Sequence, residues 1–237
     1  MDNNTGVVCI SHVEYGTGQR FDLEKLCFAA HDNGALFIVD ATQSAGAIPI
    51  DLNTCPIDAV VSGAYKWLCG PFGAAVMYLA PHLQRTLEPG LVGFRSHKNI
   101  WNLNAERLEY PKSAQRFEFS TMAYGCAAGL AKSIEFLVQI GIENIFKYNL
   151  FLADILVDGL RKRNANISSY PSNKYRSSIV TASFDGQDLS KIILELKNAK
   201  VYLSKRGNAL RFSPHLYNKR DDIEKALDHL DKIRLNQ

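Results

Sequence analysis

Short apolar runs alternate with amphipathic stretches along the first half of the chain. Polar residues do not interrupt these runs, which is typical of strands that are buried on both faces. Between the first two runs, Asp22 stands in the N-cap position of a helix with one apolar face over residues 23–30, and Asn33-Gly34 is a typical C-terminal pair. The alternation predicts an α/β fold with a mainly parallel sheet covered by helices, whose strands are residues 7–10, 36–39, 59–61 and 74–79.

The second half begins with an irregular stretch and continues as a smaller α/β unit. Residues 89–119 are rich in Arg, Asn and aromatic side chains without a clean period, which is typical of a functional or interface loop. The patterns place a domain boundary near residue 140, between domains of residues 1–140 and 141–237. The predicted elements are helices over 122–138, 145–160, 189–196 and 223–233, and strands over 178–184, 201–203 and 210–212.

Composition and charge narrow the class of protein. Of 237 residues, 46% are hydrophobic and 22% are charged, values of an ordinary globular chain. The formal net charge of +3 is dispersed, which argues against a nucleic-acid or membrane partner. Five scattered cysteines without a Cys-x-x-Cys pair suit reduced thiols. Without a signal peptide or an apolar run of ~18 residues, the expectation is a soluble, cytoplasmic protein.

Three polar residues follow buried strands in the first half. Asp40 ends the 36–39 run, Gln43 follows shortly after, and Lys66 lies just beyond the 59–61 run. Ligands of α/β sheets bind at the carboxyl ends of strands. A lysine there can form a Schiff base with an aldehyde, and a carboxylate can keep a pyridine nitrogen protonated. Each residue alone is more often a turn, cap or surface residue, but together they indicate a carbonyl-type cofactor.

Asp40, Gln43 and Lys66 lie within longer sequence motifs. Residues 39–46 read VDATQSAG, and residues 64–73 read AYKWLCGPFG. Further along, residues 116–121 read RFEFST, and residues 211–218 read RFSPHLYN. In these motifs the chain resembles the class V aminotransferase family. These are pyridoxal-phosphate (PLP) enzymes of fold type I, and they include cysteine desulfurases, selenocysteine lyases and isopenicillin N epimerase-like proteins.

The resemblance implies a role for each motif residue. Lys66 would hold the cofactor as a Schiff base and move the proton at the substrate Cα. Asp40 would pair with the pyridine nitrogen, and Gln43 with the phenolic oxygen. Thr121 matches the residue that reaches the phosphate of the neighbouring subunit's cofactor, which implies a homodimer. Arg211 matches the arginine that binds the α-carboxylate of an amino-acid substrate, a task suited to a bidentate guanidinium.

Several positions depart from the family pattern. Gly63 stands where many relatives carry a phosphate-binding Ser, and the neighbouring Ser62 is a candidate substitute. Tyr65 replaces the His of the desulfurases and is a candidate cofactor contact. Glu14-Tyr15 replaces a Ser-Asn near the substrate, which indicates a different substrate. Residues 204–209 contain no Cys, which disfavours persulfide-forming desulfuration.

The resemblance starts midway through the family's large domain. The N-terminal portion, with its Gly/Thr phosphate loop and ring-stacking aromatic residue, has no counterpart here. We therefore expect the C-terminal part of the PLP-binding large domain followed by a small C-terminal α/β domain. One function that follows is a PLP-dependent lyase, epimerase or aminotransferase acting at Cα or Cβ of an amino acid through Lys66. The alternative is a truncated or split subunit that is inactive alone and acts as an assembly partner.

Other kinds of site receive little support. Gly16-Thr17-Gly18 lacks the third glycine of a dinucleotide-binding fingerprint, because Phe21 occupies that position. The six histidines have no metal-ligand spacing, so no metal site is expected. Ser11-His12 is a pair of sequence neighbours rather than part of a triad. His12 is expected to be a structural residue with satisfied hydrogen bonds.

Overall fold

The computed structural model describes residues 1–2, 4–169 and 173–235. The chain forms two compact units. Unit 1 consists of Met1–Ile10, Leu23–Thr42 and Asp51–Glu135, and unit 2 of Ser11–Asp22, Gln43–Ile50 and Phe136–Gln237. Two short early segments therefore belong to the unit that holds the C-terminal half, which the apolar pattern does not indicate. The domain boundary at residue 140 stays a prediction.

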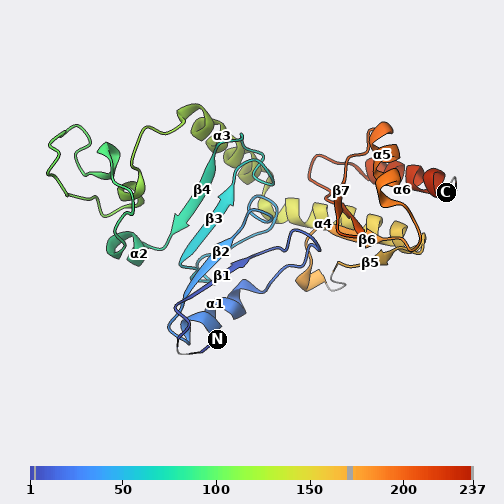
Figure 1. Ribbon diagram of the computed structural model, residues 1–237, viewed down its shortest axis with the longest axis horizontal. Coiled ribbons are helices and arrows are strands. Elements are labelled where there is room, and N and C mark those ends of the chain that lie inside the picture. The colour runs from blue at the N-terminus through green and yellow to red at the C-terminus, as the bar shows by residue number, and fades with distance from the viewer. Residues whose placement is uncertain (3, 170–172, 236–237) are drawn as a thin grey trace. The chain divides into compact units, whose positions relative to one another are not determined.

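Unit 1 is built on a four-stranded sheet with the order β1-β2-β3-β4 (Figure 1). The elements of the first 140 residues are β1 (Val7–Ser11), α1 (Leu23–His31), β2 (Leu36–Asp40), β3 (Ala59–Gly63), β4 (Ala75–Leu79), α2 (Pro81–Thr86), η1 (Phe94–Ser96), η2 (Ala114–Phe117) and α3 (Tyr124–Ile140). β2 and β3 are parallel, with Asp40 opposite Val61. β3 and β4 are antiparallel, with Gly63 opposite Ala75. The four strands lie where the apolar runs predict them.

Both faces of β2 are covered, as its uninterrupted apolar sequence predicts. Phe37 and Val39 are fully buried on one face, and α1 packs against the strand. Leu36 and Ile38 on the other face pack against a cluster that contains Leu83 of α2. The cover does not extend to β4, where the first three residues are exposed. The sheet is therefore well covered along β2, the strand that ends at Asp40, and open at its β4 edge.

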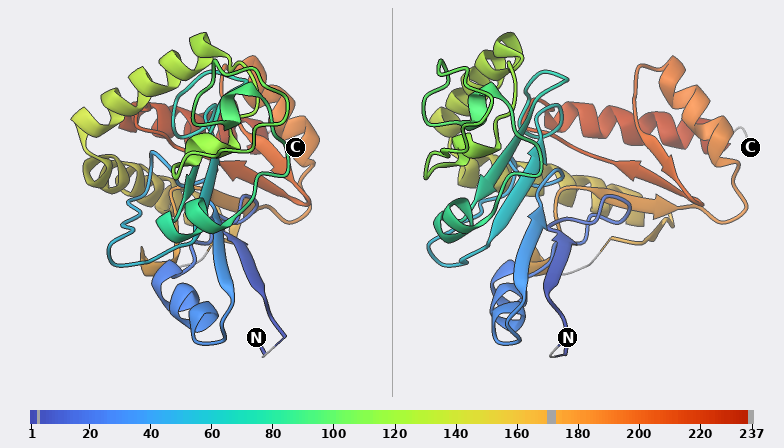
Figure 2. Two further views of the ribbon diagram at one scale, coloured as in Figure 1. Left: turned by 90° about the vertical axis from the view of Figure 1, so that its left-hand side faces the viewer. Right: turned by 60° about the vertical axis from the view of Figure 1, so that its left-hand side comes forward.

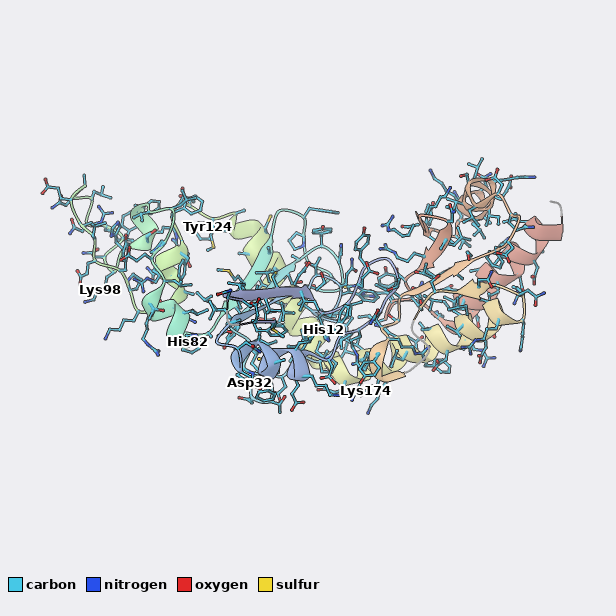
Figure 3. All side chains as sticks on the ribbon, turned by 60° about the horizontal axis from the view of Figure 1, so that its bottom comes forward. His12, Asp32, His82, Lys98, Tyr124 and Lys174 are labelled. Carbon is cyan, nitrogen blue, oxygen red and sulfur yellow. The ribbon has the colours of Figure 1, made fainter. Side chains whose placement is uncertain are left out.

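The segment between α2 and α3 is largely irregular, as predicted (Figures 1 and 2). Arg95 pairs with Glu118 at 2.6 Å between Nη2 and Oε2. The buried guanidinium of Arg116 donates to the carbonyls of Gln84 and Arg85. Lys98 also lies in this segment (Figure 3). Its exposed large apolar side chains, typical of an interface, are Leu87, Leu91, Val92, Trp101, Leu103, Leu108, Phe119 and Met122.

Unit 2 contains a four-stranded antiparallel sheet with the order β5-β6-β8-β7. Its elements are α4 (Ile142–Arg161), β5 (Asn166–Ile167), η3 (Asn173–Tyr175), β6 (Val180–Ser183), α5 (Leu189–Asn198), β7 (Ser204–Arg206), β8 (Ala209–Phe212) and α6 (Arg220–Leu235). One face of the sheet packs into a core with α4, α5 and α6 through Val180, Ala182, Leu210 and Phe212. Thr181 and Arg211, which are opposite each other, lie on the other face.

The strand predicted at residues 201–203 is wrong. Lys200 has a left-handed conformation with a φ of 63°, and the N–H of Val201 donates to the Leu196 carbonyl at 2.8 Å. This hydrogen bond closes the C-terminus of α5, so the N–H is not available to a sheet. β7 begins at Ser204 instead. Val201 and Leu203 still pack against the core, which explains their apolar pattern.

Several short elements were not predicted, among them α2 and β5. α2 begins at Pro81, and proline is favoured in the first turn of a helix because its missing N–H has no partner there. β5 has only two residues, which pair with Ala182 and Ser183 of β6. In the part of the chain that the structure describes, no single helix is long and apolar enough to cross a membrane, although α3 and α4 together reach that length and composition.

Gly18 and Gly34 form a matched pair for testing a close contact in unit 2. Both have positive φ, +76° and +72°, where another residue costs about 1–2 kcal/mol. A Cβ on Gly18 would lie 2.2 Å from the Ile179 carbonyl oxygen, whereas a Cβ on Gly34 would meet nothing within 4 Å. We expect Gly18→Ala to lower the free energy of unfolding by ~1–3 kcal/mol more than Gly34→Ala in urea denaturation. Equal losses would contradict the contact with Ile179.

Candidate active site

The unit 1 sheet brings Asp40 and Lys66 to one edge. Asp40 is the last residue of β2, and β3 ends at Gly63, shortly before Lys66. Because the two strands are parallel, their carboxyl ends lie side by side. The N–H of Thr42 donates to Oδ1 of Asp40 at 2.8 Å and orients the carboxylate. A carboxylate and a primary amine therefore leave the same sheet edge from neighbouring strands.

Lys66 lies in a tight turn held by backbone hydrogen bonds. The N–H of Cys69 donates to the Lys66 carbonyl at 2.9 Å, and the N–H of Gly70 donates to the Ala64 carbonyl at 2.8 Å. The next two residues, Trp67 and Leu68, are buried. Lys66 itself is half-buried. The turn thus fixes the backbone of the lysine, and its side chain is partly accessible to solvent.

Helix α3 supports this turn from one side. The Ser133 hydroxyl donates to the Leu68 carbonyl at 2.6 Å, and the Cys126 thiol donates to the Phe72 carbonyl at 3.5 Å. Gly129 comes close enough to Pro71 that a Cβ there would lie 3.4 Å from the proline ring. The small residues of α3 therefore allow the helix to approach the segment that carries Lys66.

Tyr65, predicted as a cofactor contact, forms an aromatic stack beside Lys66. Its ring lies 5.0 Å from the Phe72 ring, with 17° between the planes. The Lys66 Nζ lies 5.8 Å from the centre of the Tyr65 ring. A cation is attracted to an aromatic face, so Tyr65 restrains the lysine side chain. Both rings are exposed.

The other predicted cofactor residues differ in their burial and in the part of the fold where they lie. Gln43 is half-buried and is the first residue of the Gln43–Ile50 segment of unit 2. Ser62 is buried in β3, and its hydroxyl donates to the Gly63 carbonyl at 3.2 Å. Thr121 is exposed in the segment before α3. Their contacts with a cofactor stay predictions.

Arg211, the predicted carboxylate-binding residue, lies on β8 in unit 2. Its Nη1 donates to the Tyr15 carbonyl at 2.9 Å. Its Nε is buried and has no hydrogen-bond partner among the described residues. Burial lowers the pKa of Arg211, and the charge of Arg206 lowers it further, while Glu14 opposes both. A buried donor without a partner is costly, and an anion would satisfy it.

Glu14, a predicted substrate contact, closes its own turn. Its carboxylate accepts hydrogen bonds from the N–H of Gly16 at 2.9 Å, the N–H of Thr17 at 2.6 Å and the Thr17 hydroxyl at 2.9 Å. Burial raises the pKa of Glu14, but these hydrogen bonds and the charge of Arg211 outweigh it, so the net shift is downward. The neighbouring Tyr15 is exposed. The sequence did not indicate this turn, because its hydrogen bonds depend on local backbone geometry.

His12 differs from its expected role. The side chain is buried, and its Nδ1 has no hydrogen-bond partner in the described part of the chain. The prediction of satisfied hydrogen bonds is therefore wrong. Burial lowers the pKa of His12 to about 4, and the charge of Arg20 adds to this shift. Within residues 1–2, 4–169 and 173–235, no group of three or more His, Cys, Asp or Glu side chains is placed to hold a metal ion.

The chemistry of these residues fits pyridoxal phosphate. The cofactor needs an amine for its aldehyde and a carboxylate for its pyridine nitrogen. Asp40 at the end of β2 and Lys66 in the turn that follows β3 carry these two groups, and the two strands are adjacent and parallel. The buried Nε of Arg211, which has no partner within the described ranges, suits the carboxylate of an amino acid.

Solved structures define the class of fold. The apo structure of a cysteine desulfurase from Thermococcus onnurineus NA1 matches with a TM-score of 0.89 and 24% identity, over 98% of this chain and 60% of that chain. The complex of the cystine C-S lyase C-DES with cysteine persulfide matches with a TM-score of 0.87 and 23% identity, over 97% and 62%. The fold is therefore the α/β fold of fold type I PLP enzymes, as the sequence predicts.

The family follows from sequence comparison. The family model of the class V aminotransferases matches residues 1–226, and the chain belongs to this family. An uncharacterized aminotransferase of Schizosaccharomyces pombe, C777.03c, is 31% identical over 100% of this chain. A probable cysteine desulfurase of Methanothermobacter thermautotrophicus is 26% identical over 98% of this chain. The chain spans 60% and 62% of the lengths of these two relatives.

The buried histidines predict how stability depends on pH. Burial lowers the pKa of His12 and of His215 to about 4, from 6.5. Between these values the unfolded chain binds protons that the folded chain does not. The free energy of unfolding should therefore fall as the pH is lowered from 6.5 to 4, by up to about 3 kcal/mol for each histidine. Urea denaturation across this range measures the slope.

The variant His12→Gln isolates one of the two contributions. It should lose a large part of the slope and keep the part that belongs to His215. The slope is compared rather than the absolute stability, because replacing a buried side chain also changes packing. An unchanged slope in His12→Gln would show that the folded protein accommodates a protonated His12.

Proposed function

We propose that the protein is a PLP-dependent enzyme of the class V aminotransferase type that acts at Cα or Cβ of an amino acid. The observation that carries the proposal is the parallel pairing of β2 with β3, which brings Asp40 and the Lys66 turn to one sheet edge. Membership of the family supports it. The reaction would be that of a lyase, an epimerase or an aminotransferase.

The cofactor would be held mainly by residues of the two sequence motifs. Lys66 would bind the cofactor covalently through its amine. Asp40 would keep the pyridine nitrogen protonated, and Gln43 would hydrogen-bond the phenolic oxygen. When bound, PLP supplies an electron sink for the negative charge left at Cα. Further proposed contacts are those of Ser62, Tyr65 and Thr121.

The substrate would be held and deprotonated by separate groups. Arg211 would bind the α-carboxylate with its guanidinium, whose Nε has no partner among the described residues. Lys66 would take the proton from Cα and return it. Glu14 and Tyr15 would border the substrate, with Glu14 already fixed by Gly16 and Thr17. These roles require Lys66 to lose its own proton first.

Relatives named as cysteine desulfurases do not determine the reaction of this chain. Residues 204–209, where the sequence has no Cys, form a hairpin in which β7 and β8 are joined by Gly207-Asn208. β7 and β8 are paired directly up to that turn, with Arg206 opposite Ala209. This supports chemistry at Cα or Cβ without a persulfide on this segment.

We further propose that the enzyme is a cytoplasmic homodimer. The exposed position of Thr121 suits a residue that reaches a neighbouring subunit. The exposed apolar side chains between α2 and α3, such as Leu91 and Trp101, suit an interface. The described cysteines are all free thiols, which suits a reducing compartment.

An alternative function is that of an assembly partner that is inactive alone. The observation that favours it is the exposure of β4. Val76 and Met77 are adjacent on this strand and point to opposite faces, yet 40% and 52% of their surfaces are exposed. An edge strand of this kind is a surface for pairing with another chain.

Covalent labelling of Lys66 separates the two functions. The purified chain is mixed with PLP, its visible absorption is recorded, and the mixture is reduced with borohydride before peptide mass mapping. We expect a visible band and a reduced cofactor fixed on Lys66, because this half-buried lysine follows β3 at the sheet edge where β2 ends in Asp40. Lys66→Ala should lose the band and the label, a reduction of at least tenfold.

The control is Lys98→Ala, which removes an exposed lysine paired with Glu109 at 3.0 Å. It should retain the band and the label on Lys66. Equal labelling of Lys66→Ala and the unchanged protein would contradict the role of Lys66. A folded chain, judged by circular dichroism, that shows no band would favour the assembly partner.

A further inference from the structure

The face of the unit 2 sheet that carries Arg211 also carries a second arginine. Arg211 lies opposite Ser204 in the ladder of β7 and β8, and Arg206 lies opposite Ala209. Side chains two residues apart on a strand point to the same face, so Arg206 is a diagonal neighbour of Arg211. Leu210 lies on the opposite face, in the hydrophobic core. The fold therefore places two guanidiniums side by side, away from the core.

Both arginines contact Tyr15, in different ways. The Arg206 guanidinium carbon lies 5.7 Å from the centre of the Tyr15 ring. The Arg211 Nη1 donates to the Tyr15 carbonyl at 2.9 Å. The ring holds one guanidinium by a cation–π contact, and the main chain holds the other by a hydrogen bond. Tyr15 thus restrains two cations at one place.

The two positive charges are only partly neutralised. Burial and the charge of Arg206 lower the pKa of Arg211, which means that the two cations repel each other. Glu14 opposes this shift, but its carboxylate is engaged by Gly16 and Thr17. The Arg211 Nε has no partner among the described residues. A second negative group beside Arg211 would relieve the repulsion.

We propose that Arg206 binds a second carboxylate and that the substrate is an amino acid with an acidic side chain. The proposal rests on the proposed function, in which Arg211 binds the α-carboxylate. Arg206 then binds the carboxylate of the side chain and sets substrate specificity. One guanidinium suffices for one carboxylate, because the two form a bidentate pair. Two restrained guanidiniums therefore suit a dicarboxylate.

The test compares two ligands that differ by one carboxylate. Succinate and butyrate have the same number of carbon atoms, and each is titrated into the full chain without PLP, with binding followed by NMR. We expect succinate to bind about tenfold more tightly than butyrate at low ionic strength, because it makes one more charge-assisted contact. Arg206→Gln should remove this preference and leave butyrate binding unchanged. Arg211→Gln should weaken the binding of both ligands.

Lys205→Gln is the matched control. Lys205 is the neighbour of Arg206 on β7, but it lies opposite Leu210, and its Nζ contacts the Ser190 hydroxyl at 3.3 Å. The substitution removes the same charge from the other face of the strand. It should leave the preference for succinate within about twofold, which separates a directed contact from a general effect of net charge.

Three outcomes would overturn the proposal. In the first, the unchanged protein binds succinate no more tightly than butyrate, or binds neither. In the second, Arg206→Gln weakens the binding of both ligands equally, which would mean that both arginines bind the same carboxylate. In the third, Lys205→Gln removes the preference as well. The titration does not depend on the labelling of Lys66, so failure of the proposed enzyme and failure of this specificity remain distinguishable.

Discussion

The parallel pairing of β2 with β3 determines where the carboxylate and the amine of this chain can act. Its register sets Asp40 opposite Val61, and β3 ends at Gly63 just before the Lys66 turn. A shift of this register by one residue would move Asp40 to the other face of the sheet. The burial of Phe37 and Val39 prevents such a shift, because it would expose both side chains. The packing of the core therefore also fixes the position of Asp40 at the sheet edge.

The hydrogen bonds of the Lys66 turn are a second constraint on the site. Ser133 of α3 holds the Leu68 carbonyl, and the Gly70 N–H holds the Ala64 carbonyl, so the turn is fixed on both sides of the lysine. The Tyr65 ring attracts the Lys66 side chain in its charged form. The aromatic stack therefore restrains the amine beside the turn that carries it.

The sequence predicts those elements whose positions are determined by the burial of apolar side chains. The apolar runs at 36–39 and 59–61 place β2 and β3, since only a covered strand tolerates such runs. The strand predicted at 201–203 fails because the Val201 N–H caps α5, a choice of backbone conformation that hydrophobicity does not encode. The turn of Glu14 and the diagonal placement of Arg206 and Arg211 are not evident from the sequence for the same reason. Both depend on local geometry and strand register, which residue types alone do not fix.

The departures from the family pattern fall in both units of the chain. In unit 1 they are Gly63 and Tyr65, whereas Asp40, Gln43 and Lys66 themselves match the pattern. The departures at Glu14-Tyr15 and in the 204–209 hairpin lie in unit 2, on the groups that surround Arg211. Electron demand at Cα is the same for every amino acid, whereas the side chain must be recognised separately. Under the proposed function, the departures around Arg211 would therefore alter which amino acid is bound, while Asp40 and Lys66 would keep the means of activating it.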